Sequence, residues 1–535
     1  MRPLDWAVLA GSIAFIVGYG LWRSRNIRTT AEYLLAAKEM PWYAMALSIM
    51  ATQASAITFL STTGQAYADG MRFVQFYFGL PLAMIVISAT AVPIFHRAGV
   101  YTAYEYLEKR FDAKTRALVT LIFLVQRGLA VGVALYAPAL VLTVILGWSD
   151  QITTLIMGAA VVFYTAAGGI KAVTWTDFQQ MLIMMAGLAA SLIAAIALLP
   201  AGVSLMDAVR LAGEAGKLNA VVLEFDPNDR YNVWSGLIGG MFLALAYFGC
   251  DQSQVQRYLT GRSIAQSRLS LLFNAVAKIP MQFLILFTGA MVYVFYLFHP
   301  PPMVFHPGEM SRIERRADAA QFQERFRRAW QARERAAREN PAALKDAQRE
   351  LDQVRKDAGA PNDANYVFLS FVIRHLPAGL VGLILAAIFA AAMSTISGEI
   401  NSLATVTVID VYQRHFAPRG TDVQYLWASR AATVFWGGYA VVTAKYGASL
   451  GSLIEAVNML GSLFYGGLLG VFALAFYFPR VGANAAFAGV LLGEAAIFAA
   501  WRFTSISFLW YNVVGAAVVV SSAWLLSRGV KSEAN

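Results

Sequence analysis

The sequence predicts an all-α integral membrane protein with about 13 transmembrane helices, and composition and hydropathy are the two observations behind that prediction. Of its 535 residues, 58% are hydrophobic and only 14% are charged, whereas soluble proteins carry roughly 25% charged residues. Apolar runs of about 20 residues, the length of a helix that crosses a bilayer, recur along the chain. This pattern excludes a soluble globular or disordered protein, and the single cysteine, Cys250, excludes an intramolecular disulfide or a multi-cysteine metal centre.

Each apolar run is a candidate span because it is long enough to cross the hydrocarbon core. The runs occupy residues 5–22, 43–66, 73–96, 117–147, 151–168, 177–199, 234–252, 269–298, 377–398, 424–444, 449–478, 483–501 and 506–527. The first run is too long for a cleaved signal peptide and lacks a small-residue cleavage site, so we expect it to be a membrane helix.

The basic residues fall unevenly on the two sides of the predicted bundle. When loops are assigned alternately, the side opposite the N-terminus holds 19 Lys and Arg, and the N-terminal side holds seven outside its one long loop. Since positive charge is retained in the cytoplasm, we expect the N-terminus outside, the C-terminus in the cytoplasm and a location in the cell (inner) membrane. The net charge of +10 then belongs to cytoplasmic loops, and we expect the lipid bilayer as a partner, with no nucleic acid and no obligate protein partner.

The long loop, residues 300–366, is a charged insert between two apolar runs. It carries 13 Lys and Arg and 11 Asp and Glu, and its composition predicts exposed helices over 311–339 and 341–358, separated at Asn340-Pro341. Oppositely charged residues at i,i+4 spacing support these helices: Glu324/Arg328 and Glu334/Arg338. We expect a solvated extracytoplasmic insert without a role in transport; a device that binds a partner is the alternative.

The remaining runs form two halves of five. Residues 43–199 hold the first five and residues 234–478 the second five, flanked by an extra N-terminal helix and loop (1–42) and by two C-terminal helices with a short tail (479–535). An odd number of spans places the second half upside down relative to the first. Such inverted repeats are typical of transporters, which bind their solute near the membrane midplane between interrupted helices.

The first run of each half carries a polar interruption. In the first half it is the stretch 51–56, Ala-Thr-Gln-Ala-Ser-Ala, and in the second half it is 249–253, Gly-Cys-Asp-Gln-Ser. Unwound backbone at membrane depth is tolerated where it lines a cavity or is buried in protein. Small and polar residues that mediate close helix packing are the alternative, and two interruptions in corresponding places favour a binding site.

Three motifs then carry a resemblance to a known family. They are Gly168-Gly169-Ile170-Lys171 continuing to Gln180, the Asp251-Gln252 run that ends in Val255-Gln256-Arg257-Tyr258-Leu259, and Ala391-Ala392-Met393-Ser394-Thr395-Ile396-Ser397. In this order they closely resemble the sodium:solute symporter family over about residues 3–500, excluding the insert. The resemblance implies the five-plus-five fold of the bacterial leucine transporter, Na+ as the coupling ion, and alternating access as the mechanism.

The resemblance also implies where sodium binds. It places the ion among the carbonyl oxygens and hydroxyls of Ala51, Ala54, Ala391, Ser394 and Thr395. Neutral oxygens suit a hard cation, and an unwound helix exposes its carbonyls. Without the resemblance, bonds back to their own helix would be the favoured interpretation of the two hydroxyls.

A possible second sodium site is implied at Asp177, Ser394 and Ser397. The chain departs from the pattern at the next position, where some relatives carry a hydroxyl and this sequence has Gly398. The stoichiometry is therefore open. Glu399 follows Gly398. We expect Glu399 to be a carboxylate at a helix end that faces cytoplasmic water; a proton relay is the alternative.

The solute site is expected beside the sodium. Thr58, Tyr77 and Ala244 stand where sugar-transporting relatives have Gln, Glu and Asn, so most of the sugar pattern is lost. The residues that the resemblance and their polarity nominate as solute contacts are Gln53, Thr58, Tyr77, Arg127, Tyr247, Phe248, Lys278, Asn458 and Tyr465.

Arg127 and Lys278 are cations inside predicted spans, where a charge usually faces a cavity or a counter-ion. Arg127 could attract an anionic solute or form a structural pair with a carboxylate such as Asp251. Because the stretch 53–56 is most similar to the iodide, vitamin and monocarboxylate branch, we favour a small organic anion such as a monocarboxylate.

Other functions remain as alternatives. A sodium-coupled sugar or amino-acid symporter is the nearest, and a sensory module that acts with a partner kinase is an alternative of another class. We expect no enzyme, because the spans carry no nucleophile motif, phosphate loop or metal cluster.

Overall fold

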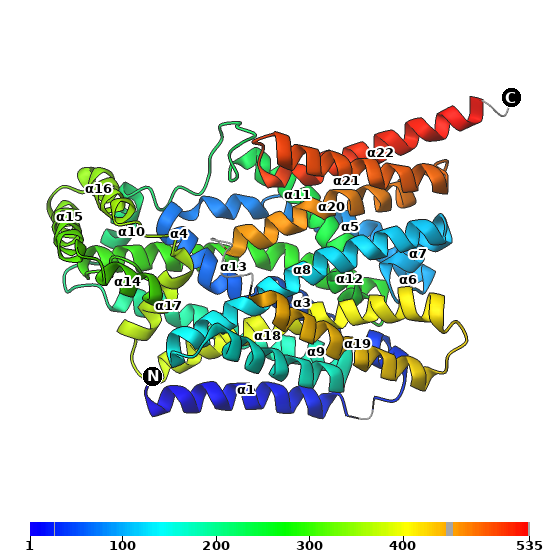
Figure 1. The fold of residues 1–535 in the computed structure, drawn as a ribbon, viewed down its shortest axis with the longest axis horizontal. Coiled ribbons are helices and arrows are strands. Elements are labelled where there is room, and N and C mark those ends of the chain that lie inside the picture. Colours follow the sequence, from blue (N-terminus) through cyan, green and yellow to red (C-terminus); the bar gives the residue numbers. More distant parts are fainter. Residues whose placement is uncertain (26, 446–452, 533–535) are drawn as a thin grey trace.

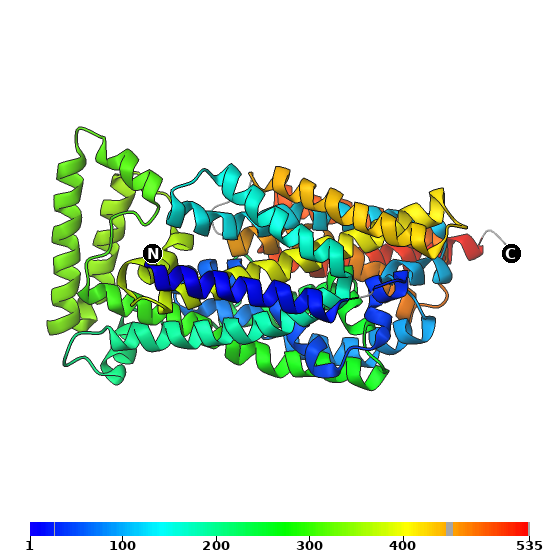
Figure 2. The ribbon, with the colours of Figure 1, turned by 90° about the horizontal axis from the view of Figure 1, so that it is seen from below.

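The computed structural model describes residues 1–25, 27–445 and 453–532, and every regular element in these ranges is a helix. Most of the helices lie side by side in one elongated bundle, and the helices of the charged insert lie across one end of it (Figures 1 and 2). The N-terminus lies at one end of the bundle, next to the charged insert, and the C-terminal helix points to the opposite end.

The elements up to residue 214 comprise the extra helix and the first half. In chain order they are α1 Pro3–Arg23, α2 Thr30–Leu35, η1 Ala36–Lys38, α3 Trp42–Gln53, η2 Thr58–Thr62, α4 Thr63–Asp69, η3 Met71–Tyr77, α5 Leu80–Ala89, α6 Ala91–Ala98, α7 Ala103–Arg110, α8 Ala113–Leu146, α9 Asp150–Ala197 and α10 Leu205–Glu214.

The elements from residue 235 comprise the second half, the insert and the C-terminal helices. They are η4 Ser235–Gly239, α11 Gly240–Gly249, α12 Gln252–Leu259, α13 Ile264–Phe298, α14 Pro307–Glu314, α15 Ala319–Glu339, η5 Pro341–Ala343, α16 Leu344–Asp357, α17 Ala364–His375, α18 Leu380–Val406, η6 Thr407–Phe416, α19 Asp422–Ala444, α20 Leu453–Tyr477, α21 Ala483–Phe503 and α22 Phe508–Ser532.

Every predicted span overlaps one or more helices, apart from residues 449–452 of the run 449–478, which lie outside the described residues, but the number of separate long apolar helices is smaller. In the described residues nine helices are long and apolar enough to cross a membrane, or ten if the bent pair α3 and η2–α4 is one span. The difference arises because α9 joins the runs 151–168 and 177–199, α11 is short, and α19 is not among the nine.

The joined helix α9 is interrupted in its backbone. A straight helix of its 48 residues would measure about 72 Å, more than twice the roughly 30 Å of a hydrocarbon core. Gly169 has φ 51° and ψ −154°, which is outside the helical region, and a Cβ there would lie 2.4 Å from the carbonyl oxygen of Tyr33. Glycine is therefore required at position 169, where the motif that begins at Gly168 packs against α2.

Both predicted interruptions are present as breaks in the helices. The α3 helix ends at Gln53, Ala54 has φ −92° and ψ 65°, and the chain bends by 61° before it continues from Thr58. In the second half α11 ends at Gly249, and Asp251 caps α12 by accepting a hydrogen bond from the backbone nitrogen of Ser253 at 2.8 Å. The two breaks face α18, which is buried along almost its whole length and packs on α9, α8 and α3.

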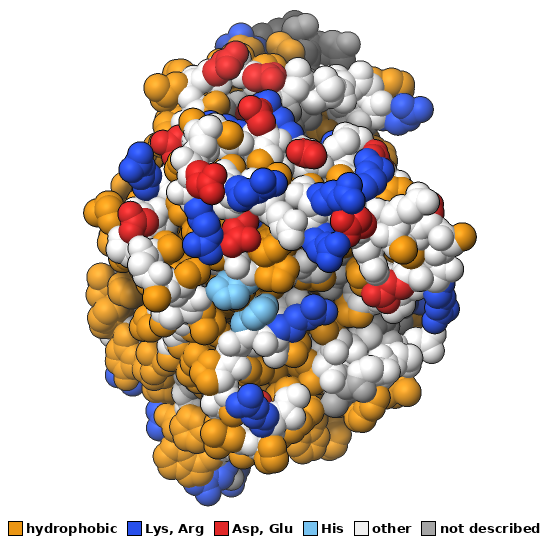
Figure 3. All heavy atoms as spheres, turned by 90° about the vertical axis from the view of Figure 1, so that its left-hand side faces the viewer, with side chains coloured by type: hydrophobic (Ala, Val, Ile, Leu, Met, Phe, Trp, Pro, Cys, Tyr) orange, Lys and Arg blue, Asp and Glu red, His pale blue; other side chains and the backbone are white. Residues whose placement is uncertain are grey.

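The insert forms a docked hairpin. Helices α15 and α16 separate at Asn340 and Pro341 as predicted, while the additional break between α14 and α15 was not predicted. Both predicted i,i+4 ion pairs form, at 2.8 Å for Glu324/Arg328 and 3.0 Å for Glu334/Arg338. Figure 3 shows acidic and basic side chains mixed over this end of the molecule.

The insert is anchored to the bundle by a buried cation. Arg333 of α15 is fully buried and donates hydrogen bonds of 2.7 Å to the carbonyl oxygen of Tyr296, near the end of α13, and to Oε1 of Gln348 in α16. Trp330 also donates from Nε1 to the Tyr296 carbonyl oxygen at 3.2 Å. A positive charge at the C-terminal end of a helix complements the helix dipole, so the insert caps α13.

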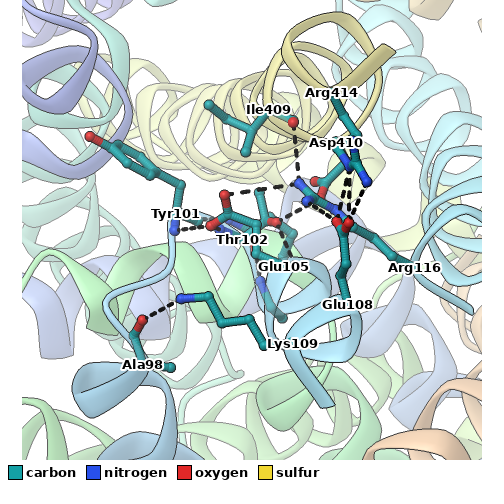
Figure 4. A network of polar contacts seen from close by, with 12 residues as sticks. Ala98, Tyr101, Thr102, Glu105, Glu108, Lys109, Arg116, Ile409, Asp410 and Arg414 are labelled. Atoms are coloured by element: carbon teal, nitrogen blue, oxygen red, sulfur yellow. Dashed lines mark hydrogen bonds and ion pairs between the residues drawn. The ribbon is translucent and has the colours of Figure 1, made fainter. Parts of the chain in front are cut away.

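A charged network closes the opposite end of the bundle (Figure 4). Arg116 of α8 donates hydrogen bonds of 2.7 Å to Glu108 of α7 and to Asp410 of η6, and Arg414 of η6 pairs with Glu108 at 2.6 Å. Burial raises the pKa of Glu108, but the hydrogen bonds from Arg414 and Arg116 outweigh it and leave that pKa below its ordinary value. The network joins α7 and α8 to η6, the segment that continues α18.

Candidate functional site

A cavity of about 100 Å³, lined by both polar and apolar side chains, lies between the broken helix α3–η2, η3, α8, α11, α18 and α20. Seven of the nine predicted solute contacts line it: Gln53, Thr58, Tyr77, Arg127, Tyr247, Asn458 and Tyr465. Thr395 from the predicted sodium site lines the same cavity. Residues from both halves of the chain thus meet where the sequence predicts the solute site.

Two predicted contacts lie outside the cavity wall. Phe248 is buried beside Tyr247, with ring centroids 4.8 Å apart, and Lys278 lies behind Tyr77, with Nζ 5.3 Å from the ring centroid. In the described part of the chain, Lys278 Nζ makes no hydrogen bond. Lys278 therefore does not line the cavity.

Arg127 is held by two carboxylates. Its Nη1 donates to Oε1 of Glu399 at 2.7 Å, and its Nη2 donates to Oδ2 of Asp251 and to the hydroxyl of Tyr465, the latter at 2.7 Å. The Tyr465 hydroxyl donates in turn to Asp251 Oδ2 at 2.9 Å. The ion pair between Arg127 and Asp251, which the sequence offered as one alternative, is present, and Glu399 is a second partner that the sequence did not indicate.

The prediction for Glu399 was wrong. The side chain is 4% exposed, lies inside α18 and lines the cavity, so it does not face cytoplasmic water at a helix end. The helix continues past Glu399 to Val406 and then through η6, and this continuation places the carboxylate deep in the bundle. The sequence did contain a signal for this pair. Glu399 and Arg127 are oppositely charged residues within predicted spans, and such residues usually pair with one another.

Tyr247 covers the charged cluster from the α11 side. Its ring centroid lies 5.6 Å from the Arg127 guanidinium carbon, and its hydroxyl accepts a hydrogen bond of 2.7 Å from Gln254 of α12. The tyrosine therefore connects the two segments of the second broken helix across the break at Cys250 and Asp251.

The predicted sodium residues gather where α3 ends against α18. Thr395 Oγ1 lies 3.0 Å from the carbonyl oxygen of Thr52 and 3.2 Å from that of Ala391, within hydrogen-bond distance of both. At the end of α3 the backbone nitrogen of Ala54 donates to the carbonyl oxygens of Met50 and Ala51, at 3.0 and 3.2 Å. Ser394 Oγ is buried and lies close to the Asp177 carboxylate. The Thr395 hydroxyl and the two carbonyls beside it are neutral oxygens of the kind that a hard monovalent cation binds.

The second group of predicted sodium residues contains an arginine that the sequence did not place there. Asp177 Oδ2 accepts a hydrogen bond of 2.6 Å from Ser48 and pairs with Arg257 at 3.2 Å, while Asp177 also interacts with Ser394. A Cβ at Gly398 would lie 2.1 Å from Arg257 Nη2. The glycine thus makes room for the guanidinium where some relatives carry a hydroxyl.

Ser397 is near these groups but bonds to its own helix, since its hydroxyl donates to the Ser394 carbonyl oxygen at 3.1 Å. Ser48 and Arg257 were missed because their part in the site depends on contacts of α3 and α12 with α9. In the described residues no group of three or more His, Cys, Asp or Glu is placed to hold a metal ion.

Two interrupted helices around a polar cavity in a long helical bundle define the class of protein as a secondary transporter. The chain matches the sodium:solute symporter family over residues 33–311 and 353–493 and belongs to that family. The match leaves out residues 312–352, which hold α15 and most of α16. Membership makes sodium:solute symport the activity of the chain and Na+ its coupling ion, as predicted.

Its relatives include carriers of organic acids and vitamins. The chain is 29% identical over 492 residues to the sodium-coupled monocarboxylate transporter 2 of Bos taurus, covering 91% of this chain and 71% of the relative. It is 28% identical over 494 residues to the human sodium-coupled monocarboxylate transporter 1, covering 92% and 72%. It is also 30% identical over 503 residues to a putative sodium-dependent multivitamin transporter of Drosophila melanogaster, covering 92% and 74%.

A solved structure confirms the predicted fold class. The substrate-bound, outward-open form of a sodium-coupled sialic acid symporter aligns with a TM-score of 0.80 at 23% identity, covering 98% of both chains. At this identity the likeness concerns the fold, which is the all-α five-plus-five type that the sequence predicted.

Proposed function

We propose that this symporter imports a small organic anion of the monocarboxylate class, with the solute in the cavity beside Arg127. The main support for this proposal is the similarity to monocarboxylate transporters over more than 90% of the chain. The cavity supports it, because at about 100 Å³ it is well below the roughly 300–1,000 Å³ of pockets for drug-sized ligands. Arg127 supplies the basic group that a carboxylate requires, and a bound carboxylate would exchange with one of its two carboxylate partners.

We further propose that sodium binds among Ala51, Ala54, Ala391, Ser394 and Thr395, and that Asp177, Ser394 and Ser397 form a second sodium site. An ion at the first site would connect the end of α3 to α18 and so complete the cavity wall at Thr395. Tyr247 would close the inward path until the bundle rocks. A sodium ion that enters down a potential of 100 mV contributes about 2.3 kcal/mol in addition to its concentration gradient.

We also propose how the chain is oriented in the membrane and how it is divided into parts. The N-terminus and the insert share one end of the bundle and the charged network of α7, α8 and η6 occupies the other, which supports an outside N-terminus and a cytoplasmic C-terminus in the cell membrane. The divisions at 1–42, 43–199, 234–478 and 479–535 follow the two broken helices, which each open one half. The docked insert at 300–366 supports an extracytoplasmic domain.

Uptake into proteoliposomes tests the solute class. Vesicles with purified protein receive an inward sodium gradient and ¹⁴C-labelled propionate, with glucose and proline as parallel labelled solutes and potassium in place of sodium as the control. We expect propionate uptake that requires sodium. Sodium-driven uptake of glucose or proline without uptake of propionate would refute the anion proposal and leave a sodium symporter of another solute.

A further inference from the structure

The charged cluster around the cavity holds more carboxylates than arginines. The charged groups that interact with Glu399 are Arg127, Asp251 and Arg257, and Arg257 is paired with Asp177. Two arginines therefore face three carboxylates, so one negative charge is uncompensated when all three are ionised. Lys278 does not supply the missing charge, because it interacts with no charged group in the described ranges.

One oxygen of the Glu399 carboxylate is left without a hydrogen bond among the described residues. Glu399 uses Oε1 for Arg127, while its Oε2 is buried and has no hydrogen-bond partner in residues that the structure describes. Oε1 of Gln126, a residue 1% exposed on the facing helix α8, is likewise buried and unpartnered over those ranges. Both side chains line the cavity, Glu399 from α18 and Gln126 from α8.

An uncompensated buried carboxylate is costly, because removing a charge from water is repaid only by a close counter-charge and by hydrogen bonds that satisfy its remaining lone pairs. Oxygen atoms that lack hydrogen donors are the ligands that hard cations prefer. We propose that Glu399 Oε2 and Gln126 Oε1 bind a sodium ion in the cavity, at a site separate from the one proposed at Ser394 and Thr395.

The helix geometry places this site one turn from the proposed coupling site. Thr395 and Glu399 are four residues apart on α18, so they share a face and their positions differ by about 6 Å along the axis. A solute carboxylate on Arg127 would then be accompanied by the cation at Glu399. This part of the inference rests on the proposed function, and it means that an anionic solute is carried with one more cation than the Ser394 and Thr395 site alone provides.

Binding of ²²Na+ to purified protein in detergent, without any solute, tests the site directly. We expect Glu399→Gln to bind one sodium ion fewer per protein at saturation than the unmodified chain. Glu494→Gln is the matched control, because Glu494 is a second carboxylate within a membrane helix, α21, and does not line the cavity. This control should retain the full number of ions.

An unchanged number of ions and an unchanged affinity in Glu399→Gln would overturn the inference. If that variant does not fold, Glu399→Asp keeps the charge on a shorter side chain and should weaken binding of the same single ion; unaltered affinity there would also overturn it. Failure of the proposed solute class is distinguishable, since it would appear as absent propionate uptake while the loss of one bound sodium in Glu399→Gln persists.

Transport gives a second readout. In proteoliposomes, the ratio of charge moved to solute carried should fall by one elementary charge in Glu399→Gln and stay unchanged in Glu494→Gln. A ratio that is identical in all three proteins would contradict a coupled cation at Glu399.

Discussion

Replacing Thr395 by valine tests the junction between the broken helix and α18. Valine keeps the shape of the threonine side chain but removes the oxygen that lies 3.0 Å from the Thr52 carbonyl and 3.2 Å from the Ala391 carbonyl. The side chain is buried, so a carbonyl left without a partner costs about 1–3 kcal/mol. If sodium uses this oxygen, the same loss weakens sodium affinity by about 5- to 140-fold, because each 1.4 kcal/mol is a factor of ten.

The assay is the sodium dependence of solute uptake in proteoliposomes, measured together with thermal stability of the purified variant. Thr288→Val is the control, because Thr288 is a buried threonine on α13 whose hydroxyl bonds at 2.8 Å to the carbonyl of Leu284 in its own helix. We expect this control to keep the sodium affinity of the unmodified protein. Equal sodium affinity in the two valine variants would refute the assignment of Thr395 as a ligand.

Three further perturbations follow from contacts in the structure. Arg127→Gln leaves two buried carboxylates without their cation and should lower the free energy of unfolding by about 3–5 kcal/mol; an unchanged thermal midpoint in detergent would contradict this. Gly64→Ala should prevent folding, because its Cβ would lie 1.8 Å from the carbonyl oxygen of Ala364, and Gly11→Ala, whose Cβ meets nothing within 4 Å, is the control in a size-exclusion assay. Because the pKa of Glu108 lies below its ordinary value of 4.5 in the folded protein, its contribution to stability is present above that pH and is lost as the pH falls. The thermal midpoint should therefore fall further between about pH 5 and about pH 2 in the unmodified chain than in Glu108→Gln, and an equal fall in the two proteins would argue against the Glu108 network.

The fold could be predicted from sequence because its signals are local. Apolar runs of membrane length identify the helices, and the polar stretches at 51–56 and 249–253 mark the two breaks that the structure contains. The count of separate long helices differed because α9 joins two runs through Gly169, where hydropathy gives no sign of whether the backbone stays helical.

The site was predicted in part. Residues nominated by polarity and by the family resemblance, such as Gln53 and Asn458, do line one cavity. Lys278 was nominated on the same basis but lies behind Tyr77, because a matching residue type does not fix the direction in which a side chain points.

The sequence by itself determined that the chain crosses the membrane many times, that two helices are interrupted, and that it belongs among sodium-coupled carriers. These properties depend on neighbouring residues and short motifs. The tertiary structure alone decided that Arg127 is neutralised by Asp251 and Glu399, which lie 124 and 272 residues away along the chain. Ion pairing depends on distances across packed helices, and no local pattern encodes those distances, so the charge of the cavity became visible only in the folded molecule.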